Sequence, residues 1–261
     1  MTAENTTVRA HQPGPSGSPE GRLDPDGALV LDGRIVLVAG ATSASGEAVC
    51  RALAAAGATV LAVGTRPEAL DALAKAVPGV DTRVCDLADR SAVAELAMRI
   101  HLTFGHIDGL IHLVGGWRGG AGIPGQGDDD WMLLERSFET LRNTSRVFYD
   151  DLVESSAGRL AIVSSTAVEH PYAGGANYAA AKAAADAWTR AIAQGFAKDA
   201  PKAAAAIFVV KTLSGLEKEL ASRVVGLWSQ EASEINGVRQ LLSIQSADGE
   251  ETSAEPARIE R

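Results

Sequence analysis

Short apolar runs alternate with amphipathic stretches along most of the chain. The runs predict seven strands, over residues 35–39, 59–63, 82–85, 107–114, 160–164, 206–210 and 238–244. Helical patterns fill the intervals, over residues 46–56, 65–76, 91–102, 130–155, 178–197 and 216–228. Continuous apolar strands separated by helices are typical of parallel sheets covered on both faces. The pattern therefore predicts an α/β, doubly wound fold with a mostly parallel, seven-stranded sheet.

The two ends of the chain have a different composition. Residues 1–28 and 246–261 are rich in Pro, Gly, Ser and acidic side chains, which predicts flexible tails around one domain over residues 29–245. A hydrophobic content of 46% in 261 residues suffices for a substantial core. No apolar stretch has the length of a membrane span, and the amino terminus lacks the apolar segment of a secretory signal. We therefore expect a cytoplasmic protein.

Charge and cysteine content exclude several classes of partner. The formal net charge is −9 at pH 7, and no run of Lys or Arg could follow a phosphate backbone, so we expect neither nucleic acid nor a membrane surface as partner. Cys50 and Cys85 lack the spacing of metal ligands and fall in apolar patterns. Buried, reduced thiols and no metal are expected, with a small molecule as substrate.

Small residues from Ala39 to Gly46 join the first strand to the first helix. Gly40 suits a sharp turn there, and a helix N-terminus offers free N–H groups and a positive dipole end to a pyrophosphate. Thr42, Ser43 and Ser45 add hydroxyl donors. The segment predicts the dinucleotide-binding turn of a Rossmann fold, and the alternative is a tight strand–helix turn without a ligand.

Tyr178 and Lys182 are four residues apart on a helical pattern, so their side chains project from one face. An ammonium near a phenol favours the phenolate and lowers a pKa that starts at about 10. Such a phenol is suited to proton transfer. Ser165 closes the fifth strand, at the carboxyl edge where open α/β sheets carry their sites. The alternative is a surface Tyr and Lys with an unrelated strand-end serine.

This Ser–Tyr–Lys spacing and the Gly40–Gly46 turn resemble the short-chain dehydrogenase/reductase family, over about residues 29–244. Ala39 and Ala44 stand where the family's T-G-x-x-x-G-x-G motif has its threonine and middle glycine. The resemblance implies that Ser165 hydrogen-bonds the substrate oxygen. It also implies that Tyr178 is the acid–base group and that Lys182 holds the nicotinamide ribose.

The residue types after the second strand bear on which nucleotide binds. In the family an acidic residue there selects NAD, but here Gly64 holds that position and is followed by Thr65 and Arg66. A guanidinium pairs well with a 2′-phosphate, so NADP(H) is favoured over NAD(H). Arg66 could equally be a solvated arginine in the first turn of a helix that Thr65 caps in a capping box with Glu68.

Further cofactor contacts are implied after the third and fourth strands. Asp86 and Leu87 match the family's pair beside the adenine, although Asp86 could simply cap a helix or turn. Val114 and Gly115 fall where the family has the end of its N-N-A-G motif. The first residue of that motif is His112 here, a possible hydrogen-bond donor or a packed strand-end histidine.

Three other departures concern proton transfer and the substrate lid. Phe138 replaces the family's helical asparagine and cannot relay protons, and Asn143 is not assumed to substitute for it. Lys211-Thr212 replaces Pro-Gly, and the lid segment after it is short. A glycine-rich loop over residues 116–130 could cover the site with Trp117 and Arg118, or be a plain surface loop.

The sequence thus predicts an NADP(H)-dependent oxidoreductase that acts on a carbonyl or alcohol, with Tyr178 as the acid–base group. The alternatives are a cofactor-binding scaffold and a non-redox isomerase, cyclase or dehydratase on the same fold. The resemblance also implies a homo-oligomer, a dimer or tetramer. The Ala-rich stretch 179–187 permits close helix contacts for it but could equally serve the core.

Overall fold

The computed structural model describes residues 22–23 and 29–243. The predicted tails, 1–28 and 246–261, therefore lie almost wholly outside the described residues. Within the first of them, β1 (Arg22–Leu23) pairs antiparallel with β2 (Leu29–Val30), ahead of the main sheet.

Seven parallel strands form the main sheet, in the order β5-β4-β3-β6-β7-β8-β9. They are β3 (Ile35–Ala39), β4 (Thr59–Gly64), β5 (Asp81–Val84), β6 (Gly109–His112), β7 (Arg159–Ser165), β8 (Ala204–Val210) and β9 (Arg239–Leu241). The chain winds outward from β3 to β5 and then from β6 to β9. Because the direction reverses between β3 and β6, a crevice for ligands is expected at the carboxyl ends of these two strands. The predicted doubly wound fold is confirmed.

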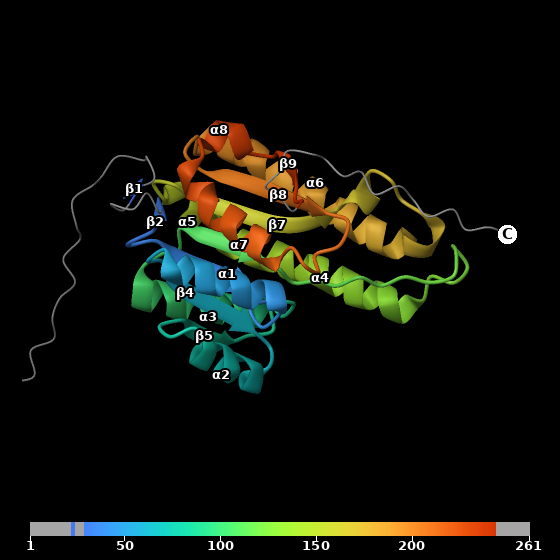
Figure 1. The fold of residues 1–261 in the computed structure, drawn as a ribbon, viewed down its shortest axis with the longest axis horizontal. Helices are drawn as coiled ribbons and strands as arrows, with labels where there is room; N and C mark the ends of the chain where they lie inside the picture. Colours follow the sequence, from blue (N-terminus) through green and yellow to red (C-terminus); the bar gives the residue numbers. More distant parts are fainter. Residues whose placement is uncertain (1–21, 24–28, 244–261) are drawn as a thin grey trace, which may run out of the picture.

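Helices cover both faces of this sheet (Figure 1). They are α1 (Ala44–Ala55), α2 (Pro67–Ala76), α3 (Arg90–Phe104), α4 (Asp128–Val147), α5 (Tyr149–Glu154), α6 (Ala176–Asp199), α7 (Glu217–Gly226) and α8 (Ala232–Ile235). Helices α1 and α7 pack on one face, and α3, α4 and α6 on the other. A search of the described helices finds none with the length and apolarity of a membrane span.

The five central strands of the main sheet are buried from both sides, which explains their mostly apolar sequences, whereas the edge strands β5 and β9 are partly exposed. Val38 packs with Leu53 and Val224 on the α1/α7 face, whereas Leu37 packs with Phe196 on the α6 face. Both cysteines are buried, as predicted. Burial raises the pKa of the Cys50 thiol to about 12 and that of Cys85 to about 11.

Two local predictions are wrong. The helix expected over residues 130–155 is divided into α4 and α5, because Phe148 has a ψ of 11° and departs from helical geometry. The capping box is absent, since Arg66 rather than Thr65 is the N-cap of α2 and no side chain caps it. The proline at the first helical position explains this shift, because a residue before proline is driven into extended backbone.

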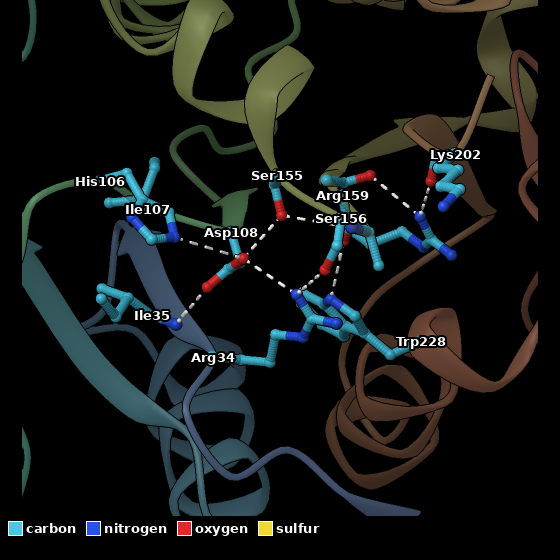
Figure 2. Close-up of polar contacts among 12 residues, drawn as sticks. Arg34, Ile35, His106, Ile107, Asp108, Ser155, Ser156, Arg159, Lys202 and Trp228 are labelled. Carbon is cyan, nitrogen blue, oxygen red and sulfur yellow. Dashed lines mark hydrogen bonds and ion pairs between the residues drawn. The ribbon is translucent and has the colours of Figure 1, made fainter. Parts of the chain in front are cut away.

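A buried polar cluster joins the strands at the amino edge of the sheet (Figure 2). The Asp108 carboxylate accepts hydrogen bonds from Arg34 at 3.0 Å, from Ser155 at 2.6 Å and from the backbone N–H of Ile35 at 3.0 Å. Arg159 donates to backbone carbonyls beside it, and burial lowers its pKa to about 10. Buried charges are tolerated only when they have hydrogen-bond or ion-pair partners, so we interpret this cluster as one that stabilises the fold.

Candidate active site

The turn between β3 and α1 is shaped by two glycines. Gly40 has a φ of +80°, and a Cβ on it would lie 2.9 Å from the carbonyl carbon of Leu113. A Cβ on Gly46 would lie 2.4 Å from the Gly40 carbonyl oxygen. Ala44, which replaces the motif's middle glycine, has a negative φ and so carries no backbone strain. The turn therefore tolerates the alanine at 44 but requires glycine at 40 and 46.

The three hydroxyls predicted for this turn have different surroundings. Ser43 is the N-cap of α1, because its Oγ accepts from the Gly46 N–H and donates to the Gly40 carbonyl, both at 3.0 Å. Ser45 is buried. Thr42 lines the adjoining pocket, so it is the hydroxyl best placed to meet a ligand.

A pocket of about 310 Å³ opens at the carboxyl ends of β3, β4 and β5. Most of the predicted cofactor positions line it, namely Gly40, Thr42, Thr65, Asp86, Leu87, Val114 and Gly115. Arg66 is exposed at the start of α2 and is outside this lining. The volume and the mixed polar and apolar wall suit part of a nucleotide.

Sequence reasoning missed the contribution of α4 to this pocket. Leu133, Arg136, Ser137 and Thr140 line it from one face of that helix, and Arg136 forms an ion pair with Asp86. Their spacing of three and four residues marks a common helix face. That spacing was visible in the sequence, but only the fold reveals what the face meets.

Tyr178 and Lys182 meet at a second pocket, of about 240 Å³, beside the first. The Lys182 Nζ lies 5.9 Å from the centroid of the Tyr178 ring and donates to the Val163 carbonyl at 2.7 Å. Ser165 is buried at the end of β7, where its Oγ accepts from the Ala167 N–H at 3.1 Å, and it lies near enough to Tyr178 to affect the pKa of the phenol. The structure therefore brings the three predicted residues together.

Burial governs the ionisation of this group. It raises the pKa of Tyr178 above its ordinary value, against the effect of the Ser165 hydrogen bond. It also lowers the pKa of Lys182 to about 8, against the effect of the Asp186 carboxylate. The sequence predicted a lowered tyrosine pKa. The direction differs because burial disfavours the phenolate and is the largest effect on Tyr178, so the phenol stays protonated at neutral pH.

A family model for the short chain dehydrogenases matches residues 34–213. The chain belongs to the short chain dehydrogenase family.

Curated relatives of this chain include several enzymes with different substrates. It is 30% identical to the 2,3-dihydro-2,3-dihydroxybenzoate dehydrogenase of Bacillus subtilis over 62% of this chain and 64% of that protein. It is 32% identical to an NADP-dependent 3-hydroxy acid dehydrogenase of Salmonella typhi over 57% of this chain and 61% of that protein. The chain thus spans less than two thirds of the length of these relatives.

Solved structures share the fold at lower sequence identity. A short chain dehydrogenase from Pseudomonas syringae has a TM-score of 0.74 at 21% identity, covering 85% of this chain and 98% of that one. A metagenomic short-chain oxidoreductase, solved in complex with NADP, has a TM-score of 0.71 at 24% identity, covering 81% of this chain and 99% of that one.

The asparagine that the family carries on this helix has no counterpart on α4 of this chain. Phe138 stands there and packs edge-on against Trp188, with ring centroids 6.3 Å apart. Asn143 donates to the carbonyls of Leu87 and Ala88, both at 3.1 Å, and so joins α4 to the segment between β5 and α3. Neither side chain lies at the Tyr178 pocket.

His112 instead lies at the base of that pocket, in place of the family's first motif asparagine. It is buried, and its Nε2 lies 2.8 Å from the Thr140 Oγ1. Burial, aided by Lys182, lowers the pKa of its imidazole to about 3. His112 is therefore neutral at physiological pH, a packed histidine with one hydrogen-bond partner on α4.

The glycine-rich loop contributes to both pockets. Trp117 lines the Tyr178 pocket, and its indole N–H donates to the Tyr172 hydroxyl at 3.2 Å. Arg118 lines the first pocket, at the ends of β3, β4 and β5. Gln126 fastens the loop to the start of α6, because its side-chain oxygen accepts from the Asn177 N–H at 3.0 Å. The loop expected as a possible lid is thus anchored beside the site.

Proposed function

We propose that this protein is an NADP(H)-dependent oxidoreductase that acts on a carbonyl or alcohol. One observation carries the proposal: Tyr178 and Lys182 share a pocket that adjoins the larger pocket at the ends of β3, β4 and β5, which we assign to the nucleotide. Val114 and Gly115 line both pockets. A dinucleotide that spans both pockets would bring its nicotinamide end to the phenol. The bound cofactor supplies or accepts the hydride.

The turn around Gly40 and Gly46 has the chemistry for a pyrophosphate. Its two glycines let the main chain of the turn pack closely against its neighbours, and its short side chains would leave the remaining backbone N–H groups open to a ligand. The free N–H groups of the first turn of α1 and the Thr42 hydroxyl would bind the phosphates. Asp86 and Leu87 would hold the adenine, and Lys182 the nicotinamide ribose.

Proton transfer is assigned to Tyr178. Its phenol is protonated at neutral pH, so it can donate a proton to the oxygen of a carbonyl substrate as the carbon is reduced. Ser165 would orient that oxygen by a hydrogen bond. In the direction of alcohol oxidation the phenolate form of Tyr178 would receive the proton from the alcohol and become the phenol.

The preference for NADP(H) rests on charge. No carboxylate follows β4, where Gly64 ends the strand, and Thr65 lines the pocket. Arg66 stands next in sequence and is exposed, so its guanidinium is available to a 2′-phosphate. The names of several relatives also refer to NADP.

Two measurements test the proposal. Binding of NADPH and NADH is compared by fluorescence titration, and turnover is followed at the nicotinamide absorbance with a panel of 3-oxo acids, cyclic ketones and aldehydes. Tyr178→Phe is expected to lower turnover by roughly 10²- to 10⁴-fold while NADPH affinity is retained. Turnover equal to that of the wild type would contradict the role of Tyr178. Substrate conversion without an absorbance change would instead support a non-redox reaction.

A further inference from the structure

A buried carboxylate lies behind the proposed acid–base pair. Asp186 follows Lys182 on α6 by the same four-residue step that separates Lys182 from Tyr178, so the three side chains share one helix face. Asp186 has 0% exposure and forms an ion pair with Arg239 of β9. The family resemblance assigned no role to either residue.

Arg239 connects segments that are far apart in the sequence. Besides Asp186, it donates to the backbone carbonyl of Ser165 at 3.1 Å, and its Nε lies 3.3 Å from a carboxylate oxygen of Glu169. Its side chain is 15% exposed. A guanidinium has five donors in a fixed plane, so one arginine can hold a carboxylate and a carbonyl at once. The last strand is thereby tied to α6 and to the end of β7.

The Asp186 carboxylate also affects the charge of Lys182. Burial raises the pKa of Asp186 above its ordinary value, against the effects of the Ser164 side chain and of the charges of Arg239, Arg190 and Lys182. A buried carboxylate held in its ionised form needs such partners. Asp186 in turn favours the ammonium form of Lys182 against its burial.

Few other groups near Lys182 can change its charge. His112 of β6 contributes a neutral imidazole at physiological pH, Tyr178 contributes a protonated phenol, and the carbonyl of Val163 on β7 accepts from the ammonium. Asp186 is thus the anionic partner that acts on Lys182.

We propose that Asp186 and Arg239 are positioning residues for the acid–base site. Asp186 keeps Lys182 in its ammonium form, and Arg239 fixes both Asp186 and the Ser165 end of β7. Neither residue is in the lining of the two pockets. The proposal rests on the proposed function for its effect on turnover, but its effect on Lys182 is measurable in the protein without cofactor.

The test is a titration of Lys182 in the ligand-free protein, by NMR of ¹³C-labelled lysine, with the signal assigned from Lys182→Met. Asp186→Asn keeps the shape of the side chain and removes its charge. Lys182 is then expected to lose its proton at a pH about one unit lower than in the wild type. The alkaline limb of NADPH affinity and of turnover should move to lower pH by the same amount.

Arg239→Lys distinguishes the positioning effect of the Arg239 guanidinium from the effect of its positive charge. It preserves the positive charge but loses the planar fork, so turnover is expected to fall about tenfold while the Lys182 titration stays in place. Arg223→Gln is the matched control, because Arg223 forms a comparable ion pair with Glu219 on α7, away from the site. It should change neither the titration nor turnover.

A double variant tests the proposal even if the single variants are destabilised by an unpaired buried charge. Asp186→Asn with Arg239→Gln removes both charges, so no unpaired ion stays buried, and a cooperative thermal transition verifies the fold. Its Lys182 titration should also lie below that of the wild type. An unchanged Lys182 titration in the single and double variants overturns the positioning role. Failure of NADPH to bind the wild type, or unchanged turnover in Tyr178→Phe, counts against the proposed function instead.

Discussion

The ammonium of Lys182 donates a 2.7 Å hydrogen bond to the backbone carbonyl of Val163. This bond links the Lys182 side chain to β7, the strand that ends in Ser165. It therefore fixes the position of α6 relative to the sheet at the site. An ammonium has three donors, and one is used here. The others can meet ligand oxygens beside the Tyr178 ring.

Lys182 should give NADPH binding a marked pH dependence. Its folded pKa of about 8 is below the ordinary 10.5, so the ammonium is lost as the pH rises through about 8. We expect NADPH affinity to be highest below pH 8 and to weaken above it, because the ribose loses a charged donor. Fluorescence titrations from pH 6 to 10 measure this. Lys182→Met should bind weakly without the step, and a flat wild-type profile to pH 10 would contradict the role.

His112 should make the fold sensitive to acid. Its folded pKa of about 3 lies below the ordinary 6.5, so between these values the unfolded chain binds a proton that the native state does not. The free energy of unfolding should therefore fall by about 1.4 kcal/mol per pH unit below pH 6.5, in addition to other groups. Above pH 6.5 the residue contributes no pH dependence.

Urea unfolding at pH 7 and pH 4.5 tests the contribution of His112. The difference in stability between the two pH values should be smaller in His112→Asn than in the wild type by about 2 to 3 kcal/mol. His170→Asn is the control, because His170 is exposed and should leave that difference unchanged. Equal acid sensitivity in the wild type and His112→Asn would contradict the prediction.

Much of the fold was predictable because the central strands are buried on both faces. A run such as Ile35–Ala39 has no polar side to confuse its assignment, and glycines at 40 and 46 mark the turn that follows. Interruptions within helices were harder to predict. The restart of the helix at Phe148 depends on a backbone angle that a continuous helical pattern does not reveal.

The site was predictable where residues are local in sequence or occupy a family motif. Tyr178 and Lys182 are one helical turn apart, so their juxtaposition follows from the helix alone. The Asp186–Arg239 ion pair joins residues 53 positions apart, and only the order of the strands brings them together. The raised pKa of Tyr178 was missed because burial, a tertiary property, outweighs its neighbours.

Arg66 should determine the choice between the two nicotinamide dinucleotides. Arg66→Gln is expected to weaken NADPH binding about tenfold or more and to leave NADH binding unchanged, because only NADPH offers a 2′-phosphate to the guanidinium. Isothermal titration calorimetry with both nucleotides measures the ratio. Lys75→Gln makes the same charge change at the other end of α2 and serves as the control. Equal affinities for NADPH in the wild type and Arg66→Gln would show that Arg66 does not determine the nucleotide preference.

Gly46→Ala should damage both stability and cofactor binding. The new Cβ would lie 2.4 Å from the Gly40 carbonyl oxygen and 2.6 Å from the backbone of Ala41, so α1 must move away from the turn. We expect a loss of about 1 to 3 kcal/mol in the free energy of unfolding and at least tenfold weaker NADPH binding. In the control, Gly226→Ala, the Cβ meets only the Gln230 side chain at 3.9 Å and φ is −63°, so stability should hold or rise. If Gly46→Ala melts at the wild-type temperature and binds NADPH with wild-type affinity, the turn accommodates the Cβ without strain. The prediction that residue 46 must be glycine for stability and cofactor binding is then wrong.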